Sequence, residues 1–236
     1  MLSIIDLIEA GTLDLDKSGW LISRIESGSS FLVGAKPGGA GKTTVMGALL
    51  VMLPPGAQLY LAGDRTTSRS RLETTDEQQD SAAAGRSSNS ACNKYMVSYE
   101  ISPAFYEGYV WGKAVREMFA MTDLGFKIAA NLHADTLGEA KHQIVMENGV
   151  PEHQFNTCGI FVPITLRGWK REVNRIFYYD NPEEEGWREL SRYRKPLERE
   201  IEIQDFLKSC VRNNIRQIEE VRTEWLALRS RHIKMY

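Results

Sequence analysis

The residues best suited to chemistry lie in one glycine-rich stretch, residues 38–44, which follows the apolar run 31–35 and precedes a helical pattern. Glycines let successive backbone N–H groups turn towards one anion, and the N-terminus of the next helix adds a positive dipole. A lysine and a hydroxyl at the end of such a loop can reach phosphate oxygens and a magnesium ion. The stretch therefore predicts a phosphate-binding loop.

This loop follows the Walker A pattern except at its first position. The pattern has glycine six residues before its lysine, where this chain has Lys36, followed by Pro37. Lys36 is then either a second phosphate contact or a solvated side chain. We expect ATP with Mg²⁺ as the ligand and Thr43 as the metal ligand. The predicted nucleotide contacts are Gly38, Gly39, Ala40, Gly41, Lys42, Thr43 and Thr44.

Glu100 is the first candidate for a catalytic partner of the loop. It stands near the end of the apolar run 95–101, and a strand end in a parallel α/β sheet faces the ligand crevice. A carboxylate there can polarise water for attack on a γ-phosphate. The alternative is a strand-end glutamate in solvent. Tyr99 occupies the position where a Walker B pattern often has aspartate, so magnesium would rest mainly on Thr43, water and phosphates.

His133 is the second catalytic candidate, because it ends the next apolar run, 128–133. A histidine there can donate a hydrogen bond to a γ-phosphate or orient the attacking water; alternatively it is a structural histidine. Asp64 follows the run 58–63 and either joins the magnesium shell through water or forms a turn.

The elements that must position these residues alternate between strand and helix. Four apolar runs read as strands, beginning at residues 31, 58, 95 and 128, and the run 58–63 reads as a buried one. Helical patterns cover much of 1–27, the stretch from Lys42 to Pro54, the stretch from Pro103 to Gly125, and the stretch from Thr136 to Gly149. Thr136 and Glu139 form a capping box.

The C-terminal third departs from this alternation. Residues 159–166 and 172–178 read as an antiparallel hairpin about 167–170, and a linker at 181–186 leads to an amphipathic helical tail with a break near Asn213. We therefore predict an α/β fold: a mainly parallel sheet with helices on both faces, a terminal antiparallel hairpin and a helical C-terminal tail.

We expect two parts of the chain, a core at 1–180 and a linker with helical tail at 181–236. Within the core, residues 66–93 have only one large aliphatic side chain, Leu72, and are rich in Ser, Thr and charged residues. Such a stretch buries too little apolar area to offset its ordering entropy. We expect a mobile insertion there.

Composition narrows the class of protein. The chain has 236 residues and a net charge of −2, so no overall field favours nucleic acid. The three cysteines, Cys92, Cys158 and Cys210, have no metal-site spacing and suit free thiols in a reducing compartment. We see no signal peptide and no transmembrane run, and expect a cytoplasmic protein.

Three segments, in order, resemble the type II and type IV secretion and pilus-biogenesis ATPases: 34–44, 97–100 and 131–140. In that family a strand ends in the Walker B glutamate, here Glu100, and a Leu-His-Ala histidine box follows, here at His133. The resemblance covers roughly residues 15–180 and implies a RecA-like core, ATP binding and usually a hexamer. We expect two departures from the family: the chain has no room for the family's N-terminal domain, and only Asp64-Arg65 could serve as the acidic box that the family has between its Walker A and Walker B motifs.

The leading functional hypothesis is a Mg²⁺-dependent ATPase that resembles secretion and pilus motors and drives a conformational change in an assembly. The alternative is a nucleotide-gated binding module with little or no hydrolysis. A small-molecule kinase would need a lid, for which 65–86 is the one candidate.

We expect a homo-oligomer, such as a ring, and a protein partner that the sequence does not name. The tail from Leu197 to Leu228 packs either on its own core or on a neighbour. The arginines that a neighbouring subunit could present are Arg65, Arg116, Arg167 and Arg171.

Overall fold

A computed structural model describes residues 2–63, 93–104, 106–180 and 186–233 of the chain. Asp64, Arg65 and nearly all of the expected insertion at 66–93 lie outside these residues. The helices are α1 (Ile4–Glu9), α2 (Leu15–Glu26), α3 (Lys42–Leu50), α5 (Lys113–Ala120), α6 (Leu137–Lys141), α7 (Glu152–Asn156), α8 (Glu198–Arg212) and α9 (Ile218–Ile233). The strands are β1 (Phe31–Gly34), β2 (Gln58–Leu61), β3 (Lys94–Ile101), β4 (Tyr109–Val110), β5 (Lys127–Leu132), β6 (Ile160–Pro163), β7 (Thr165–Arg167), β8 (Lys170–Glu172), β9 (Phe177–Tyr179) and β10 (Trp187–Glu189).

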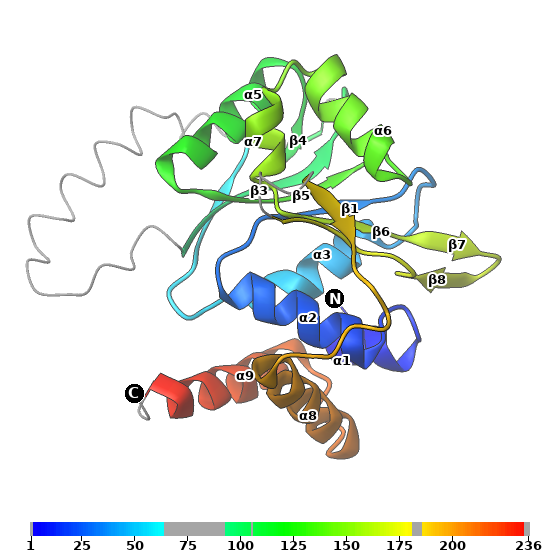
Figure 1. Cartoon of the computed structure of the whole chain (residues 1–236), viewed down its shortest axis with the longest axis vertical. Helices are drawn as coiled ribbons and strands as arrows, with labels where there is room; N and C mark the ends of the chain where they lie inside the picture. Colours follow the sequence, from blue (N-terminus) through cyan, green and yellow to red (C-terminus); the bar gives the residue numbers. More distant parts are fainter. Residues whose placement is uncertain (1, 64–92, 105, 181–185, 234–236) are drawn as a thin grey trace, which may run out of the picture.

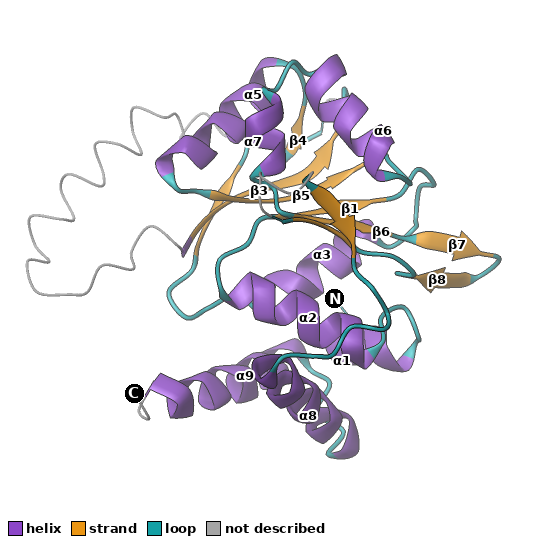
Figure 2. Cartoon of the chain, in the orientation of Figure 1, coloured by secondary structure: helices purple, strands orange, loops and turns teal. Residues whose placement is uncertain are grey.

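A central, mostly parallel sheet separates two groups of helices, as the α/β prediction required (Figures 1 and 2). Helices α5, α6 and α7 cover one face and α1, α2 and α3 the other, with α8 and α9 in a further layer beyond them. Each face has its own hydrophobic cluster. Strand β1 is buried along its whole length because both of its faces meet helices.

The strand order brings three strand ends to one edge of the sheet. The main path of the sheet runs β10-β9-β6-β1-β5-β3-β2, with β4 beside β3. Strands β1, β5 and β3 are consecutive neighbours and parallel, with Gly34 and Ile101 both in register with Leu132. The segments that leave these three strands at their carboxyl ends therefore start side by side.

The helix expected from Pro103 begins later than the pattern indicated. Residues 109–110 form β4, which pairs with Glu100 and Ile101, and the helix α5 starts only at Lys113. Gly108 and Gly112 both have positive φ, a conformation that interrupts a helix and that glycine adopts at little cost. Phe105, which the helical pattern included, lies outside the described residues.

The run 58–63 is a strand but not a buried one. Strand β2 ends the main path of the sheet and, among the strands that the structure describes, pairs with β3 alone; Leu59 is 54% exposed. An apolar run alone does not show whether its strand is central or at an edge.

The segments 159–166 and 172–178, expected to form one hairpin, form two separate strand pairs. Strands β7 and β8 form a separate two-stranded antiparallel sheet around the predicted turn, and the hairpin projects from the body of the protein (Figure 1). Strand β6 joins β1 in parallel, and β9 returns antiparallel beside β6. The strand β10, next to the expected linker, extends the antiparallel edge.

Only one of the two hydrogen bonds of the expected capping box at Thr136 forms. The Thr136 hydroxyl accepts a hydrogen bond from Glu139 N at 3.2 Å, which starts α6 as expected. The Glu139 carboxylate accepts instead from Asp135 N at 2.9 Å and pairs with Lys36. The helix then continues as a π-helical turn, His142–Glu147, and Gly149 follows with φ of +71°.

The tail packs on its own core. Its two helices, α8 and α9, are separated near Asn213 as predicted, and Asn214 has a φ of +56°. Side chains of both helices belong to the hydrophobic cluster built by α1, α2 and α3. The most deeply buried of them are Ile203, Leu207, Cys210, Val221 and Trp225.

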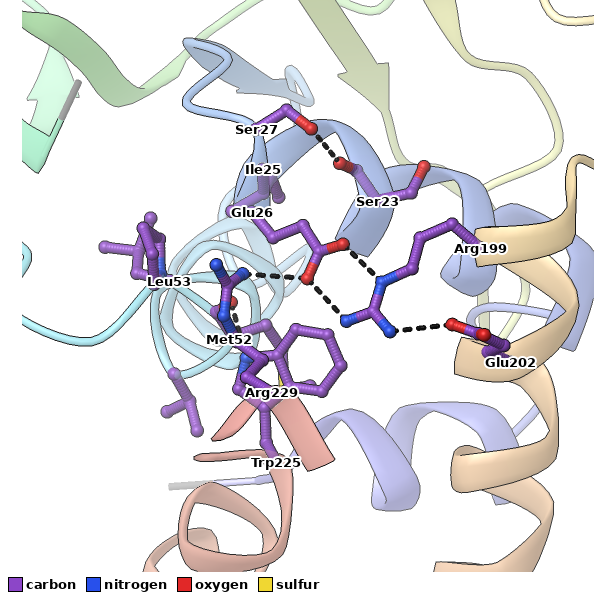
Figure 3. A network of polar contacts seen from close by, with 12 residues as sticks. Ser23, Ile25, Glu26, Ser27, Met52, Leu53, Arg199, Glu202, Trp225 and Arg229 are labelled. Atoms are coloured by element: carbon purple, nitrogen blue, oxygen red, sulfur yellow. Dashed lines mark hydrogen bonds and ion pairs between the residues drawn. The ribbon is translucent and has the colours of Figure 1, made fainter. Parts of the chain in front are cut away.

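A polar network joins the tail to the end of α2 and to the segment after α3 (Figure 3). Glu26 accepts hydrogen bonds from Arg199 Nε and Nη2 at 2.6 and 2.8 Å and from Arg229 Nη1 at 2.7 Å. The contact with Glu26 raises the pKa of Arg199, whereas burial lowers the pKa of Arg229. Between them the Trp225 indole donates to Met52 O at 2.9 Å. The network holds the last helix against the body of the protein.

Two of the three cysteines lie within the described residues. Cys158 and Cys210 are free and buried, and burial raises the pKa of both thiols, that of Cys210 to about 11. Cys92 lies outside the described residues. Among the helices that the structure describes, none has the length and apolar character needed to cross a membrane.

Candidate functional site

The glycine-rich stretch connects β1 to α3 at the edge where the three strand ends meet. Gly34 has to be glycine because a Cβ there would lie 2.3 Å from Ala134 O and 2.6 Å from the Phe161 ring. Gly41 caps α3 with a φ of +91°. A Cβ added at Gly38 or Gly39 would meet no atom within 4 Å, so this part of the loop is open.

Lys42 begins α3, and its side chain turns back beneath the loop. Its ammonium donates to Ala35 O at 2.9 Å and lies 3.0 Å from Glu100 Oε1. The side chain is 7% exposed. A buried ammonium of this kind needs a nearby negative charge, because desolvation penalises an unpaired cation by several kcal/mol, on the order of 3–5 kcal/mol when its partner is removed.

Glu100 is brought into place by an irregularity in β3. Ser98 is in register with Ala130 and Ile101 with Leu132, so β3 carries one extra residue there, a β-bulge. Bulges bend a strand and re-aim its side chains, often next to active sites. The Glu100 side chain is 8% exposed and lies beneath the loop, whereas the Tyr99 side chain points outward and is half exposed.

His133 follows β5 and approaches the same carboxylate. Its Nε2 lies 3.1 Å from Glu100 Oε1, and its Nδ1 lies 3.2 Å from Lys36 O. Glu100 Oε1 thus has a cation and an imidazole at contact distance, yet it accepts no hydrogen bond of good geometry from the described residues. A buried carboxylate oxygen left in this state is an available acceptor for a further group.

Asn131 is a residue of this site that the sequence reasoning did not single out. It is fully buried in β5; its Nδ2 donates to Tyr99 O at 2.8 Å, within the bulge, and lies 3.5 Å from Thr43 Oγ1. Its Oδ1 accepts no hydrogen bond from the described residues. A signal was present, because an amide near the end of an otherwise apolar run, 128–132, must find polar partners.

The segment after β5 holds the start of the loop. Lys36 N donates to Asp135 Oδ1 at 2.8 Å, and Lys36 Nζ pairs with Glu139 Oε1 at 2.6 Å. The hydrogen bond between these two side chains raises the pKa of Lys36 and lowers that of Glu139. Of the two roles left open for Lys36, the structure places it at the surface in an ion pair.

Arg171 reaches the loop from the β7–β8 hairpin. Its Nε and Nη2 donate to Gly39 O at 3.2 and 3.1 Å, and its Cδ lies 3.3 Å from the position that a Cβ on Gly41 would take. Arg171 is one of the four arginines that a neighbouring subunit could present; in this structure it contacts the loop of its own chain. The other arginines of that set lie elsewhere: Arg116 donates to Asn148 O, Arg167 is exposed in β7, and Arg65 is outside the described residues.

The structure therefore brings together Lys42, Glu100 and His133, which the sequence placed at three separate strand or helix ends. It does not describe Asp64, the second candidate for the magnesium shell, or the segment 65–86, the candidate lid.

Comparisons with known proteins give a distant structural likeness and no match by sequence. No protein-family model and no curated protein sequence matches the chain. Among solved structures, the fold is similar to the VirB11 ATPase from the Brucella suis type IV secretion system, crystallised in complex with sulphate. The TM-score is 0.44 and the sequence identity 17%, with 73% of this chain and 53% of that chain covered. The match thus spans about half the length of that ATPase.

Proposed function

We propose that this protein binds ATP with Mg²⁺ at residues 38–44 and hydrolyses it, with Glu100 as the base. The observation that carries the proposal is the buried Glu100 carboxylate, whose Oε1 lies 3.0 Å from the Lys42 ammonium and 3.1 Å from His133 Nε2 beside an open glycine loop. These groups suit phosphoryl transfer to water: the cation can contact phosphate oxygens, the carboxylate can activate a water molecule, and the imidazole can orient it.

The residues present fit the expected ligands. Gly38 and Gly39 leave space for phosphate oxygens above the loop, and the α3 N-terminus has no acidic residue in its first turn to repel them. When bound, Mg²⁺ would neutralise charge on the β- and γ-phosphates. Thr43 would ligate it, with its hydroxyl oriented by Asn131.

In this proposal Lys42 exchanges partners when the nucleotide binds. Its ammonium leaves Glu100 for the β- and γ-phosphate oxygens, which carry more negative charge. Glu100 Oε1 is then free to accept a hydrogen bond from the attacking water, and His133 orients that water or the γ-phosphate. The short motifs shared with secretion and pilus ATPases extend the proposal to hydrolysis that drives a conformational change in an assembly.

A nucleotide-gated binding module is the second candidate, and one observation favours it. The residue before Glu100 is Tyr99, not an aspartate that could ligate magnesium. Its side chain is half exposed. Without a second carboxylate on magnesium, hydrolysis would be slow and nucleotide binding would act as a switch.

The test compares single and paired variants at the buried ion pair. Lys42→Ala should lose ATP binding in calorimetry, but it also leaves Glu100 buried without its cation, which costs about 3–5 kcal/mol of stability. The double variant Lys42→Ala with Glu100→Gln removes both charges and serves as the matched control. If the double variant melts like the wild type and still binds ATP with wild-type affinity, the loop assignment is wrong.

Glu100→Gln alone separates binding from hydrolysis. The amide keeps the shape of the side chain and loses the base, so ATP affinity should persist while phosphate release falls by roughly 10²–10⁴-fold. Phosphate release near the wild-type rate would show that another group is the base. A wild type that binds ATP and releases no phosphate would support the binding module.

A further inference from the structure

A cavity of about 510 Å³ opens beside the glycine loop. Its size lies within the range of about 300–1,000 Å³ that is usual for small-molecule sites. Three elements form its walls: the loop with α3, the end of α1 with the turn after it, and the β7–β8 hairpin. The residues that characterise these walls are Gly41, Thr44, Leu7, Thr12, Trp169 and Arg171.

Backbone and side-chain hydrogen bonds hold the three walls together. Val173 N, just after the hairpin, donates to Thr12 O at 2.8 Å, which ties the hairpin base to the turn after α1. At the other side, the Arg171 guanidinium donates twice to Gly39 O. The cavity is therefore closed on the hairpin side by contacts within one chain.

The walls combine chemistry that suits a planar heterocycle with a sugar. Leu2, which is half exposed, gives an apolar surface above the buried Leu7, while Thr12 and Thr44 carry hydroxyl groups. Trp169 stands at the tip of the hairpin and is 96% exposed, although a large apolar side chain normally gains by burial. The Arg171 cation lies between the cavity and the loop.

We propose that this cavity receives the nucleoside half of the nucleotide whose phosphates the loop would hold, with the base stacked on Trp169. The inference rests on the proposed function, because the cavity shares Gly39, Gly41 and Thr44 with the phosphate loop. A base and ribose joined to a phosphate on that loop reach the cavity directly. Arg171 acts here as a positioning residue that keeps the loop carbonyl in place between the two halves of the site.

The test uses two probes, MgATP and inorganic tripolyphosphate with Mg²⁺, which share the phosphates but not the nucleoside. In calorimetry, Trp169→Ala should weaken ATP binding by on the order of tenfold, because it removes the base–aromatic stacking contact. It should leave tripolyphosphate binding unchanged. Trp169→Phe retains an aromatic face and should restore most of the ATP affinity.

A second variant fills the cavity instead of removing a contact. Ala10 lines the cavity and is exposed, so Ala10→Phe adds bulk there without disturbing the core. It should also weaken ATP and spare tripolyphosphate. Tyr193→Ala is the matched control: Tyr193 is an exposed aromatic, 83% accessible, beside a separate cavity of about 640 Å³ that shares no lining residue with the loop.

The outcomes separate the two proposals. If both probes bind the wild type and Trp169→Ala and Ala10→Phe change neither affinity, or change both equally, the nucleoside assignment is overturned and the phosphate loop stands. If neither probe binds the wild type, the proposed function fails and the assignment fails with it. Selective loss of ATP affinity in both variants, with the control unchanged, supports the assignment.

Discussion

At the scale of single residues, the site depends on close approach as much as on charge. Gly34 lies where β1 passes the backbone of Ala134. The two neighbours of Ala134 in the chain are His133, of the site, and Asp135, which accepts a hydrogen bond from Lys36 N. The same absence of side chains at Gly38 and Gly39 has a different consequence, since it leaves space above the loop. Glycine at position 34 and glycine at positions 38 and 39 thus have separate physical reasons.

This difference predicts opposite effects of the same substitution. Gly34→Ala places a Cβ 2.3 Å from a backbone oxygen, so the free energy of unfolding should fall by roughly 1–3 kcal/mol. Gly38→Ala meets no atom within 4 Å and should stay within about 0.5 kcal/mol of the wild type. Urea unfolding midpoints of the two variants measure the contrast, and equal midpoints would contradict the packing described at Gly34.

At the scale of elements, two features shape the site and one stabilises the body. The bulge in β3 turns Glu100 beneath the loop, and the β7–β8 hairpin carries Arg171 and Trp169 to the loop's other side. The last helix, α9, acts at a distance from the loop: Trp225 lies fully buried, with the guanidinium groups of Arg199 and Arg229 at 5.5 and 5.9 Å from its ring. Such cation–π contacts add to the burial of the ring.

The tail should therefore be a main contributor to stability. Trp225→Ala removes a fully buried ring and its hydrogen bond to Met52 O, and should lower the free energy of unfolding by about 3–5 kcal/mol. Trp169→Ala makes the same change at a side chain that is 96% exposed and should cost at most about 0.5 kcal/mol. Thermal and urea unfolding of both variants provide the comparison. Similar losses at the two positions would contradict the packing of α9.

At the scale of the whole molecule, the described part of the site lacks an arginine free to stabilise transferred charge. Among the described residues near the loop, Arg171 is already engaged with Gly39 O. An arginine at the γ-phosphate contributes on the order of 10³–10⁵ in rate. Because α8 and α9 cover the α1–α2 side of the same chain, their buried faces are not offered to a neighbour. The exposed Arg167 in the projecting hairpin remains the described candidate for donation between subunits.

We accordingly expect specific ATPase activity to rise with protein concentration as an oligomer forms. A dilution series of the rate per subunit, with light scattering on the same samples, tests this. Arg167→Ala should reduce the rate at high concentration and leave the rate of the dilute monomer unchanged. A constant rate from a monomer at every concentration would rule the assembly out.

Much of the architecture can be predicted from the sequence, because it depends on apolar runs and turn residues that are close together in the chain. The strand, loop and helix around Lys42 are adjacent in the chain, and parallel strands in an α/β sheet end at one edge. Glu100 and His133 could thus be placed near the loop from their positions at the ends of apolar runs. The break of the tail near Asn213 also follows from local chemistry, since asparagine tolerates positive φ, as Asn214 does at +56°.

Only the tertiary structure decided the contacts that join distant segments. The bulge at Tyr99–Glu100 depends on pairing with β5, and the strand at 109–110 depends on the free edge that β3 offers there. The nearness of Arg171 to Gly39 depends on how the hairpin folds back, and whether the tail packs on its own core depends on the complementary surface of α2. These are pairings between residues far apart in the chain, and propensity and periodicity describe only neighbours within one element.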